Sequence, residues 1–412
     1  MKSKGSLKLI RELNSSIILD LLKEKAPLSK YELSKYTNLS APTVSNIIND
    51  LKELGFVKEI GIGESIGGRP PLMLDLNLEG GFVIGVDIGN DDITSIVVNF
   101  LGNVVAKSIT PMNTGEDQFV IFNKIITTIS DSIKKSEKDR ALFFGMGIGI
   151  SGEVNSSKGM INYASRLKWR NVPLKSIIEN SFQIPTYIDE NVRLLSFAEN
   201  WYGAGKKHNN IVCLRVGEDI GAGIIINGEL YGGSSGNAGV NVNHMIIEPN
   251  GIDCECGNKG CLQTLVSSTA IVSRALELSK NNKTILSEYL NNDAGGLSVK
   301  KISEGAKAGD AICRKVMEDT GRYLAIAISN IITCIDPELI IIGGGIAQSG
   351  DILLEPIKKY IKNCSKLANP LLRVVPSMLG IDAYAIGAAT LVLHQIFSAP
   401  KKFISRQPAK SN

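Results

Sequence analysis

The strongest constraint on the fold is a pair of short helices near the amino terminus, each beginning with a capping residue. Ser29 begins the first helix, and Glu32 three residues later completes a capping box. Asn38-Leu39 makes a tight turn, and Ser40 then caps the second helix. The second helix ends at Gly55 and has an apolar stripe made of Val44, Ile47, Ile48 and Leu51.

The elements on either side of this pair complete a larger motif. An amphipathic helix is predicted over residues 14–25, and strand-like runs follow at 56–61 and 72–76. Between the two strands lies a glycine- and proline-rich segment, residues 63–71, which contains Gly67-Gly68-Arg69-Pro70. The order helix, helix, turn, helix, hairpin predicts a winged helix-turn-helix.

The second helix of such a motif lies in the major groove of DNA, where its early exposed residues meet base edges. Here those positions are mostly short and polar: Ala41, Thr43, Ser45, Asn46 and Asn49. Arg69, in its glycine-fronted segment, suits insertion into a narrow minor groove. A net charge of +4 is too small to indicate nucleic acid, so the prediction rests on the motif. The alternative is a three-helix protein-interaction module.

From about residue 79, strands alternate with helices. Strands are predicted at 82–87, 93–100, 104–109, 142–150, 185–188, 211–216, 222–226 and 339–342, and helices at about 117–135 and within 262–335. This alternation predicts an α/β architecture with two lobes. The predicted divisions are a DNA-binding domain at 1–78, a first lobe at 79–195 to which 377–395 return, a second lobe at 196–376, and a loose tail at 396–412.

Composition excludes a membrane span and favours a metal site. No apolar run reaches the 18 or more residues that a span requires, and no signal core follows the basic first residues. We therefore expect a cytoplasmic protein whose seven cysteines are not disulfide-bonded. Cys254, Cys256 and Cys261, together with His244, offer the one nitrogen and three sulfurs of a closed structural zinc site. The alternative is a set of free thiols beside an unrelated histidine.

Several motifs resemble those of one family. Residues 14–77, with "LSKYELSKYTNLSAPTVSNIINDLKELGFVKEIG" and "GGRPPLMLDLN", resemble the DNA-binding head of regulators in the ROK family, which includes xylose and N-acetylglucosamine repressors as well as sugar kinases. The likeness continues to about residue 395, and "CECGNKGCL" resembles the zinc signature of that family. The resemblance implies a winged helix-turn-helix followed by a two-lobed, actin-like sugar-kinase domain, with the GGRP segment reaching the minor groove.

The kinases of this family need glycine-rich phosphate loops and a carboxylate base. The corresponding loops here, Asp87–Asp92 and Gly217–Gly221, carry acidic residues that would repel a polyphosphate, whereas Gly343–Gly345 keeps the family pattern. Asn191 stands at the position of the base, and an amide cannot usefully accept a proton near neutral pH. A shift of one residue would bring Asp189 or Glu190 there instead. We therefore predict that the chain is not an enzyme and does not bind ATP.

The resemblance also implies a sugar or sugar derivative in the cleft between the lobes. In the family pattern Gly-Glu-Ile-Gly-His-Met, Asn241 replaces the glutamate, and Gln263 replaces a second glutamate. Arg166 stands where asparagine is usual, so an acidic or phosphorylated sugar is favoured, with Arg166 and Arg193 meeting its anion unless Glu190 neutralises them. The candidate effector residues are Arg166, Glu190, Asn191, Asn241, His244 and Gln263.

The sequence thus predicts a homodimeric or homotetrameric repressor of carbohydrate-metabolism genes. It would bind double-stranded operator DNA, sense a sugar-like effector and hold one structural zinc ion. One alternative is an active ROK sugar kinase with an appended DNA-binding head. Another is an effector-independent DNA-binding protein that uses the ROK domain only to oligomerise.

Overall fold

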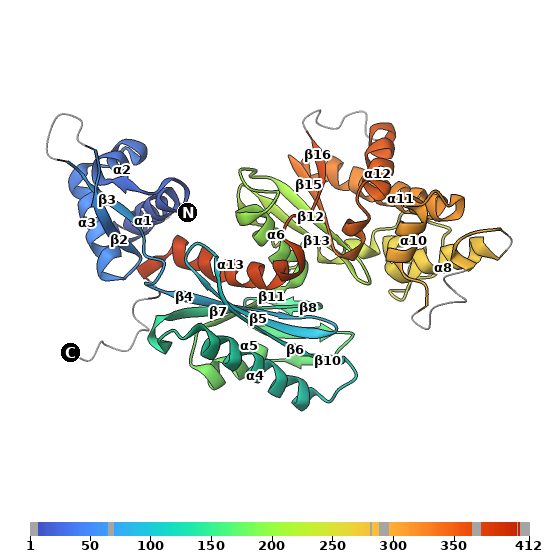
Figure 1. Ribbon diagram of the computed structural model, residues 1–412, viewed down its shortest axis with the longest axis horizontal. Helices are drawn as coiled ribbons and strands as arrows, with labels where there is room; N and C mark the ends of the chain where they lie inside the picture. Colours follow the sequence, from blue (N-terminus) through green and yellow to red (C-terminus); the bar gives the residue numbers. More distant parts are fainter. Residues whose placement is uncertain are drawn as a thin grey trace. The chain divides into compact units, whose positions relative to one another are not determined.

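In the computed structural model, which describes residues 7–64, 70–280, 282–287, 296–364, 372–401 and 403, the chain divides into two units. Unit 1 comprises Met1–Asp189 and Tyr384–Asn412, and unit 2 comprises Glu190–Ala383. Figure 1 shows both units and labels many of their helices and strands. In the described part of the chain, no helix is both long enough and apolar enough to span a membrane.

The described residues of the amino-terminal part of unit 1, the head, form three helices and a small antiparallel sheet. The helices are α1 (Leu7–Lys25), α2 (Lys30–Thr37) and α3 (Ala41–Glu53). The central strand β3 (Leu72–Leu76) pairs with β1 (Leu28–Ser29) on one side and β2 (Val57–Ile62) on the other. The predicted winged helix-turn-helix is confirmed, with β2 and β3 as its wing.

The predicted capping residues begin α2 and α3. The Ser29 hydroxyl accepts the backbone N–H of Glu32, and the Glu32 carboxylate accepts the backbone N–H of Ser29 at 2.8 Å. Asn38 ends α2 in the left-handed conformation, and the Ser40 hydroxyl accepts the N–H of Thr43. The apolar stripe of α3 is buried, so the polar face of this helix lies outward.

The larger part of unit 1 is a five-stranded sheet of order β11-β7-β4-β5-β6. Its strands are β4 (Phe82–Ile88), β5 (Asp92–Asn99), β6 (Val104–Pro111), β7 (Phe143–Ile150) and β11 (Thr186–Glu190). Helices α4 (Gln118–Ser136) and α5 (Leu174–Phe182) lie on one side, and α13 (Ala383–Ser398) lies on the other (Figure 1). A Cβ on Gly147 would lie 1.9 Å from the Ala388 carbonyl oxygen, so glycine lets α13 approach the sheet.

Two features of unit 1 differ from the sequence-based expectations. A second small sheet, of order β10-β9-β8, is formed by Glu153–Asn155, Met160–Ala164 and Trp169–Val172. The tail predicted to be loose from residue 396 is instead packed as far as it is described. Residues 396–398 complete α13, and Ala399 and Phe403 are buried, because apolar side chains in this stretch find partners in unit 1.

Unit 2 is built on a five-stranded sheet of order β14-β13-β12-β15-β16. Its strands are β12 (Ile211–Val216), β13 (Ile220–Ile226), β14 (Glu229–Leu230), β15 (Leu339–Gly343) and β16 (Arg373–Pro376). Its α-helices include α6 (Asn191–Tyr202), α7 (Leu262–Val266), α8 (Ser268–Ser279), α10 (Val299–Lys307), α11 (Ala311–Ile335) and α12 (Asp351–Cys364). Strands β12, β15 and β16 run parallel, and β13 is antiparallel to β12.

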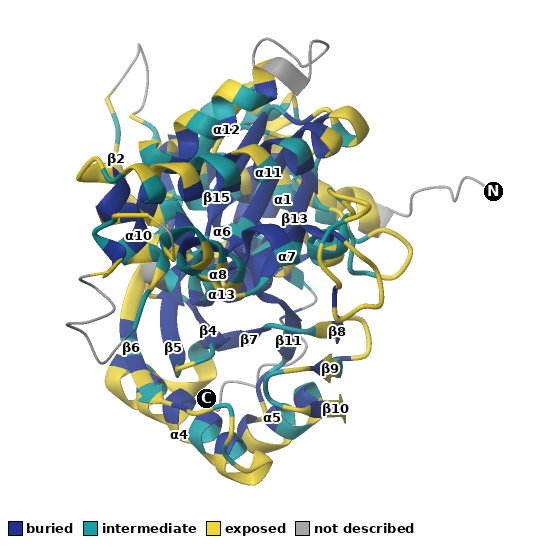
Figure 2. Ribbon diagram, turned by 90° about the vertical axis from the view of Figure 1, so that its right-hand side faces the viewer, coloured by how far each residue is buried: buried dark blue, intermediate teal, exposed yellow. Residues whose placement is uncertain are grey.

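Successive side chains of β12 point to opposite faces of this sheet, and both faces are buried. Val212 and Leu214 belong to the main core with residues of α7, α8, α10, α11 and α12. Cys213 faces the opposite side, where Ser196 and Glu199 of α6 approach it. The central strands of the sheets are buried, as Figure 2 shows. Together the two sheets with their covering helices confirm the predicted two-lobed α/β fold.

Candidate DNA-binding surface, metal centre and effector residues

The outward face of α3 carries the residues predicted to read DNA. Ala41, Asn46 and Asn49 are exposed, whereas Thr43 and Ser45 are partly buried. The Thr43 hydroxyl lies 2.8 Å from the hydroxyl of Ser40, and the Ser45 hydroxyl accepts a hydrogen bond from Lys30. Asn46 and Asn49 make no side-chain hydrogen bond to the rest of the described chain. These two amides are therefore available to a base edge.

Lys30 is a residue of this surface that sequence reasoning missed. It begins α2, and its ammonium group lies 2.9 Å from the Ser45 hydroxyl. The first helix of a helix-turn-helix crosses the DNA backbone, so a lysine at its start is suited to a phosphate. The feature of the sequence that could have indicated Lys30 is its position directly after Ser29, the predicted cap. Arg69, by contrast, lies outside the described residues.

Asp50 ties α3 to the rest of unit 1. Its carboxylate accepts hydrogen bonds from Arg11 of α1, at 2.5 Å, and from Lys401 beyond α13, at 2.7 Å. Burial raises the pKa of Asp50, but the hydrogen bonds and charges of Lys401 and Arg11 outweigh this and bring it below the usual value. Helix α3 is thus held near its carboxyl-terminal end by two cations.

A buried aromatic cluster joins the head to the large sheet of unit 1. The ring of Phe56, which precedes β2, lies 5.0 Å from that of Phe100 and 5.3 Å from that of Phe144 between ring centroids. Phe100 follows β5, Phe144 lies in β7, and their rings are 5.6 Å apart. All three side chains are buried. The head and the sheet are therefore joined by a buried aromatic contact.

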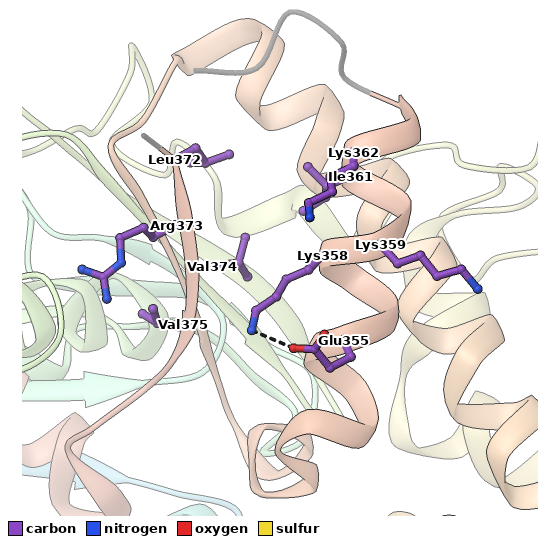
Figure 3. A pocket seen from close by; sticks show the side chains of 9 residues that line it. All are labelled: Glu355, Lys358, Lys359, Ile361, Lys362, Leu372, Arg373, Val374 and Val375. Carbon is purple, nitrogen blue, oxygen red and sulfur yellow. Dashed lines mark hydrogen bonds and ion pairs between the residues drawn. The ribbon is translucent and has the colours of Figure 1, made fainter. Parts of the chain in front are cut away.

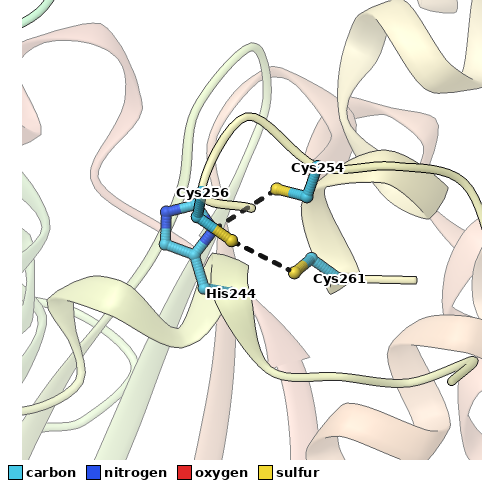
Figure 4. A group of neighbouring side chains, drawn as sticks. All are labelled: His244, Cys254, Cys256 and Cys261. Atoms are coloured by element: carbon cyan, nitrogen blue, oxygen red, sulfur yellow. Dashed lines mark hydrogen bonds between the residues drawn. The ribbon is translucent and has the colours of Figure 1, made fainter. Parts of the chain in front are cut away.

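The four predicted zinc ligands lie together in unit 2 (Figure 4). One ligand atom from each of His244, Cys254, Cys256 and Cys261 can be chosen so that all four lie within 4.8 Å of one another. Cys254 Sγ lies 3.5 Å from His244 Nδ1, and Cys256 Sγ lies 3.7 Å from Cys261 Sγ. Zinc bonds of about 2.3 Å to sulfur and about 2.0–2.1 Å to nitrogen at tetrahedral angles give separations of about 3.6 Å and 3.8 Å. The donor set and these two separations fit zinc.

The thiols of this cluster differ in their electrostatic surroundings. The backbone N–H of Asn258 lowers the pKa of Cys256, which is exposed. Burial, followed by hydrogen bonds and charge from the neighbouring thiols, raises the pKa of Cys261 to about 12. Metal binding at this cluster therefore has to release protons.

The two acidic loops that the sequence predicts at the positions of kinase phosphate loops are short turns. Gly89 N–H donates to the Asp92 carbonyl at 2.9 Å, which closes the turn between β4 and β5 and leaves Asp91 exposed. In unit 2 the β12–β13 turn exposes Glu218. Acidic side chains thus lie at both turns, as the sequence indicates.

Glu190 and Asn191 occupy the junction of β11 and α6. Glu190 caps α6 by accepting the N–H of Val192 at 2.6 Å, and its other oxygen lies 3.3 Å from Arg215 Nη2. Asn191 is buried at the first position of the helix. Arg215 is a partner of Glu190 that the sequence did not suggest. Arg193, expected to meet an anion, is itself buried and donates to the Tyr231 carbonyl at 2.9 Å.

The remaining candidate effector residues fall into two groups. Arg166 is partly buried in the turn between β9 and β10 of unit 1. Asn241 and His244 belong to a 3₁₀ segment, Val240–His244, and Gln263 lies in α7. Gly221 brings this segment near α6, because a Cβ there would lie 3.1 Å from the Val192 side chain and 3.2 Å from the Val240 carbonyl. Asn191 directly precedes Val192 in the sequence, and Asn241 directly follows Val240.

A separate hollow of about 700 Å³ lies between α12 and β16 (Figure 3). Among its lining residues, Lys358 pairs with Glu355 at 3.0 Å, and Lys359 pairs with Glu318 at 3.2 Å. The Lys359 and Arg373 side chains extend in opposite directions, so the cations do not converge. None of the residues predicted from the sequence lines this hollow.

Comparison with known proteins covers nearly the whole chain. A model described as the ROK family matches residues 83–395, and one described as bacterial regulatory protein, arsR family, matches residues 16–59. The xylose repressor of Caldicellulosiruptor bescii is 32% identical over 399 residues, which are 96% of this chain and 99% of that protein.

Solved structures agree with this relationship. The crystal structure of a ROK family transcriptional regulator, a homologue of the E. coli MLC protein, matches with a TM-score of 0.85 and 26% identity over 97% of this chain and 99% of that one. A ROK family glucokinase from Streptomyces griseus, solved with glucose and AMPPNP, matches with a TM-score of 0.64 and 27% identity over 76% of this chain and 99% of that one. The chain belongs to the ROK family.

Proposed function

We propose that this protein is a transcriptional repressor that binds operator DNA through its head and responds to a sugar. The observation that carries the proposal is the exposed pair Asn46 and Asn49 on a capped helix whose opposite face is buried. The relationship to a xylose repressor over nearly the full length of both chains supports the same function. Residues 1–78 would form the DNA-binding domain, in a homodimer or homotetramer that recognises an inverted repeat.

The coupling between head and sheet suggests how a signal would pass. The Phe56 cluster joins the head to the large sheet of unit 1, and the Asp50–Lys401 ion pair joins it to the segment that follows α13. A sugar-induced change would therefore displace the head together with this sheet. In a dimer, such a displacement would alter the spacing of the two DNA-reading helices. Operator binding depends on this spacing, because DNA half-sites lie at a fixed helical repeat.

Replacing Asn46 or Asn49 by alanine should weaken binding to the preferred operator and relax the sequence preference of the protein. Asparagine pairs bidentately with adenine, and each such pair is worth about 1–3 kcal/mol of discrimination against the wrong base. The measurement is a competition between preferred and mismatched duplexes in a gel-shift or fluorescence assay at constant salt concentration. Asn282→Ala, distant in sequence in the other unit, is the matched control. Unchanged discrimination in both α3 variants would contradict the role of this face.

We further propose that the ROK domain has no kinase activity. Asn191 at the base position, the Glu190 carboxylate engaged with Val192 and Arg215, and acidic side chains in both turns support this. The likeness to a glucokinase favours an active kinase as the second candidate. We expect no sugar-dependent ATP hydrolysis or phosphosugar with xylose, glucose or amino sugars. Sugar-dependent turnover that is lost in Asp189→Asn would instead establish the kinase.

For the effector, we propose a sugar that contacts Arg166, Glu190, Asn191, Asn241, His244 and Gln263. The amides Asn241 and Gln263 stand where the family pattern has glutamates, and Arg166 adds a cation. An acidic or phosphorylated sugar should therefore bind better than neutral xylose or glucose. Thermal-shift and calorimetric titrations with matched neutral and anionic sugars measure this preference. Tighter binding of the neutral sugar, or unchanged affinity of the anionic sugar for Arg166→Ala, would refute it. If no sugar binds, the effector-independent regulator becomes the better account.

We also propose one structural zinc ion per chain, held by His244, Cys254, Cys256 and Cys261. The two separations that match tetrahedral zinc support this assignment. Zinc would cross-link the His244 segment to the start of α7, which begins directly after Cys261. Because four protein ligands leave no open position, the ion would have no catalytic role.

A further inference from the structure

A short chain of polar side chains surrounds the metal centre. Asn243 Nδ2 donates to Gln263 Oε1 at 2.7 Å, and Gln263 Nε2 donates to Glu255 Oε1 at 3.0 Å. Asn243 directly precedes His244, and Glu255 lies between Cys254 and Cys256. The three side chains thus connect the histidine segment to the cysteine turn. Sequence reasoning did not single out Asn243 or Glu255.

The ring of His244 has a defined orientation within this arrangement. Its Nδ1 faces Cys254 Sγ at 3.5 Å, while the other ring nitrogen points away from the three sulfurs (Figure 4). That nitrogen, Nε2, lies 3.2 Å from Nδ2 of Asn243. An amide nitrogen can only donate, so in this geometry Nε2 accepts.

Binding of a metal through Nδ1 reverses this hydrogen bond. A neutral imidazole that ligates through one nitrogen carries its hydrogen on the other, which then needs an acceptor. Nδ2 of Asn243 cannot serve as that acceptor, but Oδ1 can after the amide turns over. Oδ1 is buried and has no hydrogen-bond partner among the described atoms, so the turn breaks no hydrogen bond of this oxygen.

We propose that Asn243 is a positioning residue for zinc, with its side-chain oxygen accepting the Nε2 hydrogen of zinc-bound His244. The proposal rests on the zinc site argued above. Metal-bound histidines are oriented by such acceptors, and loss of the acceptor costs about 10–100-fold in metal affinity. A glycine, which the family pattern has at this position, offers no side-chain acceptor.

The reversal extends to Gln263. Once Oδ1 of Asn243 occupies the place of Nδ2, the Gln263 amide at 2.7 Å has to present its nitrogen rather than its oxygen. The carbonyl oxygen of Gln263 then turns outward, and the exposed Glu255 moves away from it. Zinc therefore determines which hydrogen-bonding group Gln263, a proposed effector residue, offers to a ligand.

The test is the zinc affinity of the full-length protein, measured by competition with a chromophoric chelator. Asn243→Leu should weaken zinc binding by about 10–100-fold because it removes the acceptor at similar volume. Asn243→Asp should bind at least as tightly as the unmodified protein, since either carboxylate oxygen accepts. Asn250→Leu, an exposed residue of a nearby turn, is the matched control and should have no effect.

A second variant tests the direction of the hydrogen bonds. The carboxylate of Gln263→Glu cannot donate to Asn243, so we expect this variant to bind zinc about tenfold more weakly. The same loss is expected when Gln263→Glu is combined with Glu255→Gln, which removes the repulsion between the two carboxylates. If Asn243→Leu binds zinc like the unmodified protein, the positioning role is wrong. If Gln263→Glu has no effect, the reversal at Gln263 is wrong. If the unmodified protein binds no zinc, the zinc site itself fails and this inference fails with it.

Discussion

Replacing Cys256 by serine is expected to remove zinc and to unfold the loop that carries the cysteines. Structural zinc contributes on the order of 10 kcal/mol to folding a small site, and the segment between His244 and Cys261 has few apolar side chains to replace it. The same loss should follow treatment of the unmodified protein with a strong chelator. We expect both to lower the melting temperature and to weaken oligomerisation or the effector response.

The measurement combines metal analysis of the purified protein with thermal unfolding in the presence and absence of chelator. Cys334→Ser is the matched control, because Cys334 is an exposed free cysteine outside the cluster. It should retain one zinc per chain and the unmodified melting temperature. Purified protein without zinc, and with a stability that the chelator leaves unchanged, would refute the metal site.

Replacing Phe56 by alanine is expected to produce the second large effect. Truncation of a buried phenylalanine costs about 3–5 kcal/mol, because the transfer free energy is lost and a cavity remains. Here the cavity would open between the rings of Phe100 and Phe144, where the head meets the sheet. The head of Phe56→Ala should unfold at a lower urea concentration than the rest of the chain.

Urea unfolding followed by intrinsic fluorescence and by operator binding separates these two events. Phe119→Ala is the control, since that side chain is 70% exposed in the same unit. It should change the free energy of unfolding little. If Phe56→Ala cost less than about 1 kcal/mol, or if it left the effector response intact, the aromatic cluster would not couple the head to the large sheet of unit 1.

Local signals made the head predictable. Ser29, Glu32 and Ser40 act within a few residues of themselves, so their capping roles could be inferred directly from spacing, as could the turn at Asn38. The zinc ligands could be predicted for the same reason, since three of them lie within eight positions. Long β-rich runs such as β4, β7 and β12 were equally clear, because buried strands are continuous apolar stretches.

What the sequence did not reveal depends on contacts between distant residues. Phe56 looks like an ordinary wing residue until Phe100 and Phe144 are brought beside it. The strands β8, β9 and β10 are short, and their turns require positive φ at Gly159 and Lys168, so no periodic pattern marks them. Lys401 was assigned to a loose tail because its partner, Asp50, lies at the other end of the chain.

We propose that this ROK protein reads DNA through α3. The direct measurement is selection of bound sequences from a pool of random double-stranded DNA, with the full-length protein and with Asn46→Ala/Asn49→Ala in parallel. We predict that the full-length protein enriches an A·T-rich inverted repeat whose half-sites are separated by whole helical turns, and that the double variant loses this enrichment. No enriched sequence, or the same sequence enriched by both proteins, would contradict DNA reading by α3.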